Sequence, residues 1–261
     1  MGSDFELTFL GTGTSVGVPV IGCQCAVCTS DDPRNKRTRS SIHLRCEGVQ
    51  LLVDSGPDLR EQALRENLTE LDAVLYTHGH VDHVVGFDEL RAFCWRRDTP
   101  LPMHGNEATL DILKTMFGWA FSPDNVYRGY VKPDAIEIDG PFRYGRLQIT
   151  PLPVVHGRVE TNGFLFDHPD HPPIAYIPDV KEIPTATMDL IRHVDILIID
   201  ALRPSAHPTH LSVEEALSVI EHSGAQRAFL THLGHENDHA ALEATLPAHI
   251  RVAYDGLRIP S

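Results

Sequence analysis

The sequence lacks any long apolar run and any excess of basic residues. No apolar stretch approaches the roughly 20 residues that a helix needs to span a bilayer. Residues 1–4 begin the chain without the basic segment that opens a signal peptide. Lys and Arg number 22 against 36 Asp and Glu, so the formal net charge is -14. This charge disfavours broad attraction to nucleic acid or to an anionic membrane, and we expect a cytoplasmic protein with a small substrate and no membrane partner.

Cysteine is scarce as well, with five residues in the chain. Three of them, Cys23, Cys25 and Cys28, lie in the segment GCQCAVC, where the spacing is too tight for an ordinary disulfide framework. Closely spaced thiolates are typical metal ligands, so a zinc site is the first interpretation and a redox cluster is the alternative. Cys46 and Cys94 stand alone, and we expect them to pack in the core.

Short apolar runs ended by turn residues indicate a β-rich amino-terminal part. FELTFLGTGT, SSIHLRC and VQLLVDSG contain predicted strands, followed by a helix in PDLREQALREN and a strand in LDAVLYTHGH. The second half contains further apolar strands, most of which end in a polar or ionisable residue. A helix is indicated there by a capping box of Ser212 and Glu215 and by Gly224 after its last turn. Because no linker or repeat separates the halves, one α/β domain over residues 1–261 is predicted.

The segment between Cys94 and Pro151 is less regular. It contains a predicted strand in LPMHG, a predicted helix in NEATLDILKTMFGWA and a loop rich in aromatic residues. We expect this segment to shape the substrate pocket, and it is the place where a substrate lid could lie. No motif in it identifies the substrate.

The segment THGHVDH places His78, His80, Asp82 and His83 directly after an apolar strand. The three imidazoles lie at positions i, i+2 and i+5, which no single helix face would align, so a loop must gather them. Imidazole and carboxylate groups at the end of a buried strand suit Zn²⁺, Mn²⁺ or Fe²⁺. Some of the 16 His residues must be ordinary surface residues, but this density favours a metal site.

His156, Asp179 and His232 each follow another apolar strand, in PLPVVH, IAYIPD and AFLTH. Alone, each is more often a hydrogen-bonded structural residue than a metal ligand. Three apolar strands that all end in such a residue, downstream of THGHVDH, form a pattern that chance seldom gives. Their order completes a set of ligands for two metal ions.

These residues, together with Asp54 in VDSG, make the sequence similar to the metallo-β-lactamase superfamily over nearly the whole chain. The resemblance implies a four-layer αββα sandwich with both metal ions at one edge of the two sheets. Asp54 would orient a ligating imidazole without touching metal, and a turn-forming Asp is an equal alternative at this position. The resemblance also implies the ligands of the two ions: His78, His80 and His156 for one, Asp82, His83 and His232 for the other, and Asp179 as the bridge.

Two ions roughly 3.5–4 Å apart can share a hydroxide nucleophile and stabilise the entering and leaving oxygens of a phosphoester. In the superfamily, a carboxylate at the Asp179 position goes with phosphodiesterases and thioester hydrolases, whereas typical zinc β-lactamases carry Cys there. We therefore expect a metal-dependent phosphodiesterase rather than a lactamase. Asp82 and Asp179 are candidate catalytic residues, and two Mn²⁺, Zn²⁺ or Fe²⁺ ions are the expected cofactors.

The segment GTGTSVGVPVIGCQCAVC resembles a narrower, PhnP-like branch, the cyclic phosphodiesterases similar to phosphoribosyl 1,2-cyclic phosphate phosphodiesterase. This resemblance implies a structural Zn²⁺ held by Cys23, Cys25, Cys28 and His235. A closed Cys₃His site stabilises a fold rather than activating water. The alternative is that His235 is one of several solvent-facing His residues near the segment HENDH.

His210, in HPTHLSVEEA, matches the branch at a position that implies a proton donor to the leaving alkoxide. Imidazoles titrate near neutral pH in general, which suits this task. His210 also directly precedes the predicted helix that begins after Ser212, and the positive end of a helix favours a nearby phosphate. His207 is the competing candidate three residues earlier.

Three features stay open at the level of sequence. The Gly-rich residues 11–17 lack the spacing of a P-loop or a dinucleotide fingerprint, so no nucleotide cofactor is predicted. The basic run of residues 34–39 is interpreted as a solvated face, although it could meet a phosphate. The oligomeric state is open, with a homodimer among the options.

Three alternative functions compete with a small-molecule phosphodiesterase. A nuclease similar to tRNase Z shares the ligand set, but the segment between His156 and Asp179 is too short for a long tRNA-clasping arm. A thioester hydrolase of the glyoxalase II kind also shares it, and the cysteine loop argues against that choice. A non-catalytic zinc-binding protein would need a missing ligand, and none is missing.

Overall fold

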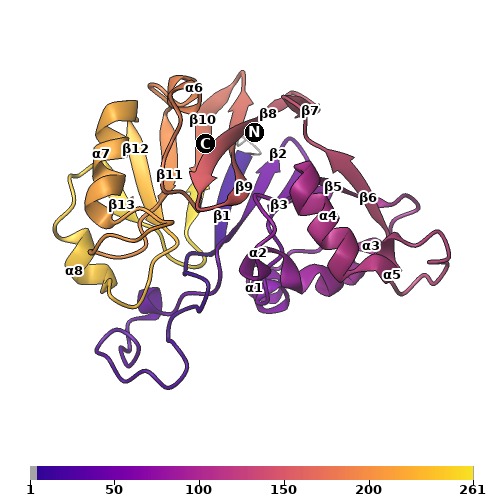
Figure 1. Cartoon of the computed structure of the whole chain (residues 1–261), viewed down its shortest axis with the longest axis horizontal. Coiled ribbons are helices and arrows are strands. Elements are labelled where there is room, and N and C mark those ends of the chain that lie inside the picture. The colour runs from indigo at the N-terminus through magenta and orange to yellow at the C-terminus, as the bar shows by residue number, and fades with distance from the viewer. Residues whose placement is uncertain (1–4, 261) are drawn as a thin grey trace.

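A computed structural model describes residues 5–260, so the expectation about a leader in residues 1–4 lies outside the described residues. Two seven-stranded sheets face each other, and helices cover their outer faces (Figure 1). The predicted αββα sandwich is confirmed. Every helix within residues 5–260 is too short or too polar to cross a bilayer.

The first sheet has the strand order β14-β1-β2-β3-β4-β5-β6. Its first strands pair antiparallel, whereas β3 to β6 run parallel to one another. The strands are β1 (Phe5–Gly11), β2 (Ser41–Cys46), β3 (Val49–Val53), β4 (Ala73–Leu75), β5 (Leu101–Gly105), β6 (Pro133–Glu137) and β14 (Arg258–Pro260).

The second sheet has the strand order β13-β12-β11-β10-β9-β8-β7. β10 to β13 run parallel, and β9 pairs antiparallel with both β8 and β10, so β8 and β10 end at the same edge. The strands are β7 (Phe142–Tyr144), β8 (Leu147–His156), β9 (Val159–His168), β10 (His171–Ile177), β11 (Ile196–Asp200), β12 (Arg227–Thr231) and β13 (Ile250–Val252).

Helices cover both sheets on the outside. Leu59 of α1 and Leu110 and Leu113 of α4 pack against the first sheet, whereas Ala216 and Ile220 of α7 pack against the second. The helices are α1 (Leu59–Arg65), α2 (Val81–Val84), α3 (Arg91–Cys94), α4 (Glu107–Met116), α5 (Gly118–Phe121), α6 (Thr185–Leu190), α7 (Val213–Ser223) and α8 (His239–Glu243), with 3₁₀ helices η1 (Pro33–Asn35) and η2 (Val85–Leu90). The capping box of α7 and its left-handed Gly224 are present as predicted.

The central strands are buried on both faces. In β11, Ile196 and Ile198 face the other sheet, while Leu197 and Ile199 pack in the layer that contains α7. This arrangement explains why the strands appear in the sequence as continuous apolar runs rather than as an alternating pattern. Each such side chain contributes roughly 1.5–3 kcal/mol through its burial, and the resulting rigid sheets fix the positions of the residues at their ends.

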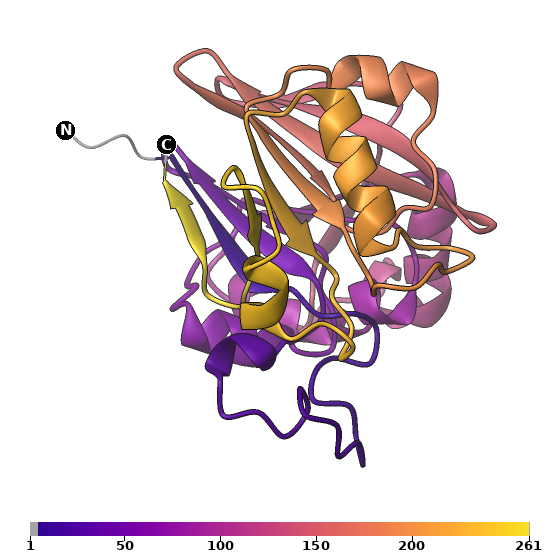
Figure 2. The same ribbon diagram turned by 90° about the vertical axis from the view of Figure 1, so that its left-hand side faces the viewer.

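The carboxyl-terminal segment IRVAYDGLRI differs from the single strand predicted for it. It forms β13 in the second sheet and β14 in the first, so it joins the two layers. The chain turns at Gly256, whose φ of 87° favours glycine. In Figure 2, β14 (yellow) lies beside β1 (indigo). β6 and β7 were not predicted, because their short sequences lack an apolar pattern.

The expectation of a lid between Cys94 and Pro151 is wrong for its aromatic loop. The loop of residues 122–132 leads into β6, which runs parallel to β5, so it lies at the amino ends of these strands. The predicted metal ligands instead follow the carboxyl end of β4. The part of the segment that reaches them is α4, since a Cβ on Gly79 would lie 2.4 Å from Cδ1 of Ile112.

Candidate metal centres

The segment THGHVDH passes from the end of β4 into the short helix α2. His78 and His80 lie on the connecting loop, and Asp82 and His83 lie in the first turn of α2. His78 and His83 are fully buried, whereas His80 is exposed. The loop therefore gathers side chains that no regular helix could align, as the spacing predicted.

Three imidazoles converge on one side of this loop. His80 Nδ1 lies 2.9 Å from His78 Nε2 and 3.3 Å from His156 Nε2. The other ring nitrogen of His156, Nδ1, donates to the carbonyl oxygen of Thr209 at 2.8 Å, which leaves Nε2 as the lone-pair nitrogen. All three ligand atoms lie within 4.8 Å of one another, close enough to share a metal ion.

Asp82, His83 and His232 form a second group on the other side. Asp82 Oδ2 lies 3.4 Å from His83 Nε2 and 3.9 Å from His232 Nε2. His232 follows β12 with a φ of 57°, in the left-handed region that few non-glycine residues adopt. Such backbone strain persists where the surrounding structure enforces it, and it is common at functional sites.

Asp179 lies between the two groups. Its Oδ2 is 3.2 Å from His83 Nε2, and its Oδ1 is 3.3 Å from His232 Nε2 and 4.0 Å from His156 Nε2. The carboxylate is buried at the end of β10. This is the position that a ligand shared by two ions would need.

The donor atoms fit a pair of divalent ions. His83 Nε2, His232 Nε2 and Asp179 Oδ2 are buried and have no hydrogen-bond partner within residues 5–260. Buried polar atoms in native proteins are normally satisfied, so each of these three calls for a further partner. Imidazole nitrogens with carboxylate oxygens are ligands that Zn²⁺, Mn²⁺ and Fe²⁺ accept.

The electrostatics of the cluster favour cations. Burial lowers the pKa of His78 well below its usual value, so this imidazole is neutral and able to bind metal. Burial acts in the same direction on His83, but the carboxylates of Asp179, Asp54 and Asp82 outweigh it and raise its pKa well above the usual value. A divalent ion would displace protons from the imidazoles in this field, as metal binding generally does.

Asp54 holds His83 in place. Its Oδ2 accepts a hydrogen bond from His83 Nδ1 at 2.7 Å, and its two carboxylate oxygens also accept from the backbone NH and the hydroxyl of Thr77 at 2.8 Å. The loop that carries Asp54 packs directly on α2, since a Cβ on Gly56 would lie 2.2 Å from the carbonyl oxygen of Asp82. Asp54 also has a positive φ, 63°. The residue therefore orients the imidazole rather than only forming a turn.

Asp200 is a site residue that the sequence analysis missed. Its Oδ2 accepts a hydrogen bond from His210 Nδ1 at 2.8 Å, and both residues are buried. The imidazole of His210 lies 4.7 Å from that of His156 and stacks 4.8 Å from that of His232. Asp200 ends β11 in the segment DILIID, so the pattern of polar residues at strand ends could have identified it.

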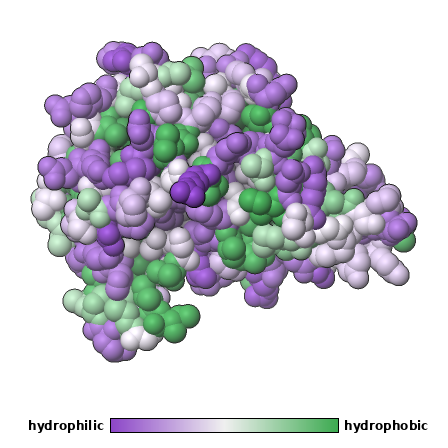
Figure 3. All heavy atoms as spheres, in the orientation of Figure 1, coloured by the Kyte–Doolittle hydropathy of each residue, from purple (hydrophilic) through white to green (hydrophobic). Residues whose placement is uncertain are grey.

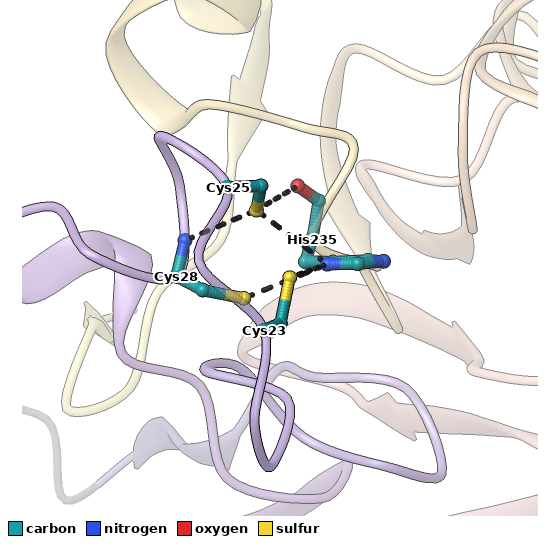
Figure 4. A group of neighbouring side chains, drawn as sticks. All are labelled: Cys23, Cys25, Cys28 and His235. Atoms are coloured by element: carbon teal, nitrogen blue, oxygen red, sulfur yellow. Dashed lines mark hydrogen bonds between the residues drawn. The ribbon is translucent and has the colours of Figure 1, made fainter.

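The three clustered cysteines meet His235 in space (Figure 4). Their sulfur atoms lie 3.3 Å (Cys23), 3.6 Å (Cys25) and 3.5 Å (Cys28) from His235 Nδ1. Hydrogen bonding to the Cys28 backbone NH lowers the pKa of the Cys25 thiol to about 6, which favours the thiolate form that binds zinc. A tetrahedral Cys₃His zinc ion fits this arrangement.

The basic run of residues 34–39 is not a uniformly solvated face, because Arg37 is buried. Its guanidinium donates to Thr12 Oγ1 and to the carbonyl oxygen of Ala253. Thr12 in turn pairs with Leu233 through its backbone carbonyl, and Leu233 directly follows His232. Arg37 thus helps to hold the turn after β1 against the strand end that presents His232.

Comparison with protein families shows which known proteins this chain is similar to. The model of the β-lactamase superfamily domain matches residues 50–233 of this chain. An octanoyltransferase from Porphyromonas gingivalis is 37% identical over 256 residues, which cover 95% of this chain and 50% of that protein. A ribonuclease Z from Bradyrhizobium diazoefficiens is 30% identical over 173 residues, covering 63% of this chain and 50% of that protein. The chain thus spans about half the length of each of these relatives.

Two solved structures are similar over almost the whole chain. A diphosphatase from the PhnP family superposes with a TM-score of 0.90 at 38% identity, covering 98% of this chain and 96% of that one. Zn²⁺-bound PqqB from Methylobacterium extorquens superposes with a TM-score of 0.80 at 22% identity, covering 98% of this chain and all of that one, which shows a shared fold.

Proposed function

The chain belongs to the metallo-β-lactamase superfamily as a PhnP-like member with a hydrolase fold, and on that premise we propose that it hydrolyses a small phosphate diester. The proposal is supported by the two groups of ligand atoms and by the buried carboxylate between them. The ligands proposed for the first ion are His78, His80 and His156, those for the second are Asp82, His83 and His232, and Asp179 would be shared.

A bound pair of Zn²⁺, Mn²⁺ or Fe²⁺ ions would make hydroxide available at neutral pH and neutralise charge on the phosphate. The protein's own groups set the geometry. Asp54 and the carbonyl oxygen of Thr209 fix the rings of His83 and His156, so that their Nε2 atoms point into the site. Because all of these groups are buried or held by hydrogen bonds, little reorganisation is needed when the substrate binds.

The observation that carries the proposal is the pair of His210 and Asp200 beside the ligand cluster. With its Nδ1–H donated to Asp200, His210 keeps Nε2 free to hold and release a proton. Asp200 fixes the tautomer and the orientation of this ring. An alkoxide is a poor leaving group unless it is protonated, so this arrangement suits a diester whose leaving group is an alcohol, including a cyclic phosphate.

A diphosphate is the second candidate substrate, because the PhnP-family structure at 38% identity is that of a diphosphatase. The bond broken would then be P–O–P, and the departing phosphate is a much weaker base than an alkoxide. Proton donation by His210 would contribute less to that reaction. The two candidates therefore differ in how strongly their turnover depends on His210.

Acyl transfer and tRNA cleavage have less support. Half of the octanoyltransferase lies outside the match, so the activity in its name is not evidence for acyl chemistry at these histidines. The residues between His156 and Asp179 form β9 and β10 and the turns around them, which leaves no arm for clasping a tRNA.

The test is a substrate panel assayed with Mn²⁺ and with Zn²⁺, using wild type and Asp179→Ala. The panel comprises a ribose 1,2-cyclic phosphate, 2′,3′- and 3′,5′-cyclic nucleotides, bis-p-nitrophenyl phosphate, a nucleoside diphosphate, a precursor tRNA and an acyl thioester. We expect metal-dependent turnover of a small diester or of the diphosphate, and loss of that turnover in the variant. Turnover of the thioester or the tRNA alone would contradict the proposal.

A further inference from the structure

Aromatic side chains gather on the outside of the molecule, after α3, on α5 and in the loop before β6. Both tryptophans of the chain are exposed, Trp95 by 62% and Trp119 by 42%. Trp119 contacts Tyr130 edge to face with ring centroids 5.1 Å apart, and Tyr130 lies 5.3 Å from Tyr127. Tryptophan and tyrosine are enriched at binding surfaces and are otherwise largely covered, so a surface cluster of this kind calls for a ligand.

A cavity of about 420 Å³ adjoins this cluster. It is lined by the chain from Cys94 to Pro100 and by two residues of the loop before β6. Its charged side chains are Arg96, Arg97, Arg128, Lys132 and a single acid, Asp98. On a chain with a net charge of -14, a cavity with four cations and one acid reverses the local field and attracts anions.

Two of the four cations are fixed and two are available. Arg97 donates to the carbonyl oxygen of Leu71 at 2.6 Å, and Lys132 donates to Asn125 Oδ1 at 2.7 Å. Arg96 and Arg128 form no ion pair with any residue between 5 and 260. The fixed cations shape the cavity, and the available guanidinium groups can bind an anion bidentately.

The cavity is separate from the candidate metal centres. Its lining residues Thr99, Pro100 and Lys132 precede β5 and β6, whereas the metal ligands follow the carboxyl end of the parallel strand β4. α3, α5 and the loop leading to β6 form the right-hand end of the molecule in Figure 1, away from α2. In the space-filling view this end is largely pale, in contrast to the green lobe formed at the bottom by the loop after β1 (Figure 3).

We propose that this cavity binds a nucleoside phosphate, with the base against Trp95 and the phosphates between Arg96 and Arg128. The indole offers an aromatic face for stacking, and the guanidinium groups match phosphate oxygens. A bare phosphate would not account for the exposed aromatic rings, and an apolar partner would not account for the cations. The volume lies in the range of small-molecule sites, about 300–1,000 Å³.

Intrinsic tryptophan fluorescence reports on this site, because Trp95 lines the cavity and Trp119 contacts Tyr130, which lies between the lining residues Arg128 and Lys132. We would titrate Asp179→Ala, which removes the proposed shared ligand and so limits turnover, with ATP, with tripolyphosphate and with ribose 5-phosphate. We expect saturable quenching by ATP and an affinity at least about tenfold weaker for tripolyphosphate, which lacks the base. Equal affinity for ATP and tripolyphosphate would overturn recognition of the base.

Charge-reversal variants test the cations. In the same background, Arg96→Glu with Arg128→Glu should weaken ATP binding by about tenfold or more, since hydrogen bonds to charged groups are worth about 1.5–3 kcal/mol each. Arg143→Glu, which changes an exposed arginine on β7, should leave it unchanged. The melting temperature of each variant checks that it is folded. Unaltered ATP affinity in the folded double variant, or quenching that instead tracks self-association by size-exclusion chromatography, would overturn the proposal.

Discussion

The proposed chemistry depends on residues whose roles follow from what they contact. His83 has the same side chain as the other histidines, but Asp54 and Asp179 on either side of it give it a fixed tautomer and a strongly negative surrounding. His210 resembles His83 in that a buried carboxylate accepts its Nδ1–H, Asp200 for His210 and Asp54 for His83. Neither the residue type nor the hydrogen-bond partner alone therefore separates a metal ligand from a proton donor, and substitution has to separate them.

Replacing His210 tests the proton-donor role. His210→Ala should lower kcat for an alkyl phosphodiester by roughly 10²–10⁴-fold, the usual contribution of general acid catalysis, with metal content unchanged. The loss should be smaller for bis-p-nitrophenyl phosphate, because p-nitrophenolate leaves without protonation. Asp200→Asn should reproduce the same pattern at smaller amplitude. An equal loss for both substrates would assign His210 to substrate binding instead.

At the scale of elements, the polar residues at strand ends could be predicted from the sequence. The side chains that pack against them could not. His156, Asp179 and His232 were identified because each follows an apolar run, and parallel strands bring such ends to one edge of a sheet. Asp200 follows the same rule and was missed because its role appears only when His210 packs against it. The metal-ligand roles themselves remain predictions.

Long-range arrangement explains the other differences between sequence and structure. The segment IRVAYDGLRI divides between two sheets because β14 pairs with β1, a contact that no local pattern reveals. The aromatic loop before β6 was expected to cover the substrate, but its position is set by the parallel pairing of β5 and β6. Arg37 was expected in solvent and is buried because Thr12, Ala253 and His239 surround it.

The cysteine loop is the element whose stability we expect to depend on metal. Cys25→Ser should remove one zinc ion per chain and lower the melting temperature, because the ligands of a structural zinc are gathered only in the native state. Activity should fall through loosening of the loop, whose cysteines contact His235 three residues after His232.

Zinc stoichiometry, melting temperature and turnover would be measured on one preparation. Cys94→Ala is the matched control, since Cys94 is buried in a different layer and should affect stability without changing zinc content. A Cys25→Ser protein with its full zinc content and melting temperature would show that these cysteines hold no zinc.

On the scale of the whole molecule, buried neutral histidines outside the metal centres should limit stability in acid. Burial lowers the pKa of His43, His104 and His239 to about 4 each. The unfolded chain, with an ordinary imidazole pKa near 6.5, takes up protons first as the pH falls. The contribution of these histidines to the free energy of unfolding should therefore be fully present above about pH 6.5. It should decline as the pH falls toward 4, by at most about 3 kcal/mol per histidine.

His104 offers a specific check, because its side chain stacks on Phe142 and hydrogen-bonds Tyr144 and is not one of the proposed ligands. We would compare urea unfolding of wild type and His104→Gln between pH 7.5 and pH 5, both after treatment with chelator so that metal release does not contribute. The variant should lose less free energy of unfolding over this interval. Parallel curves would contradict the assignment of acid sensitivity to His104.

The central claim is that two metal ions share Asp179, and anomalous diffraction from crystals grown with Zn²⁺ or Mn²⁺ tests it most directly. The account expects three metal peaks per chain. One should lie among His78, His80 and His156, one among Asp82, His83 and His232 with Asp179 bound to both, and one among the three cysteines and His235. A single peak in the histidine cluster, or two peaks with the Asp179 carboxylate bound to neither, would contradict it.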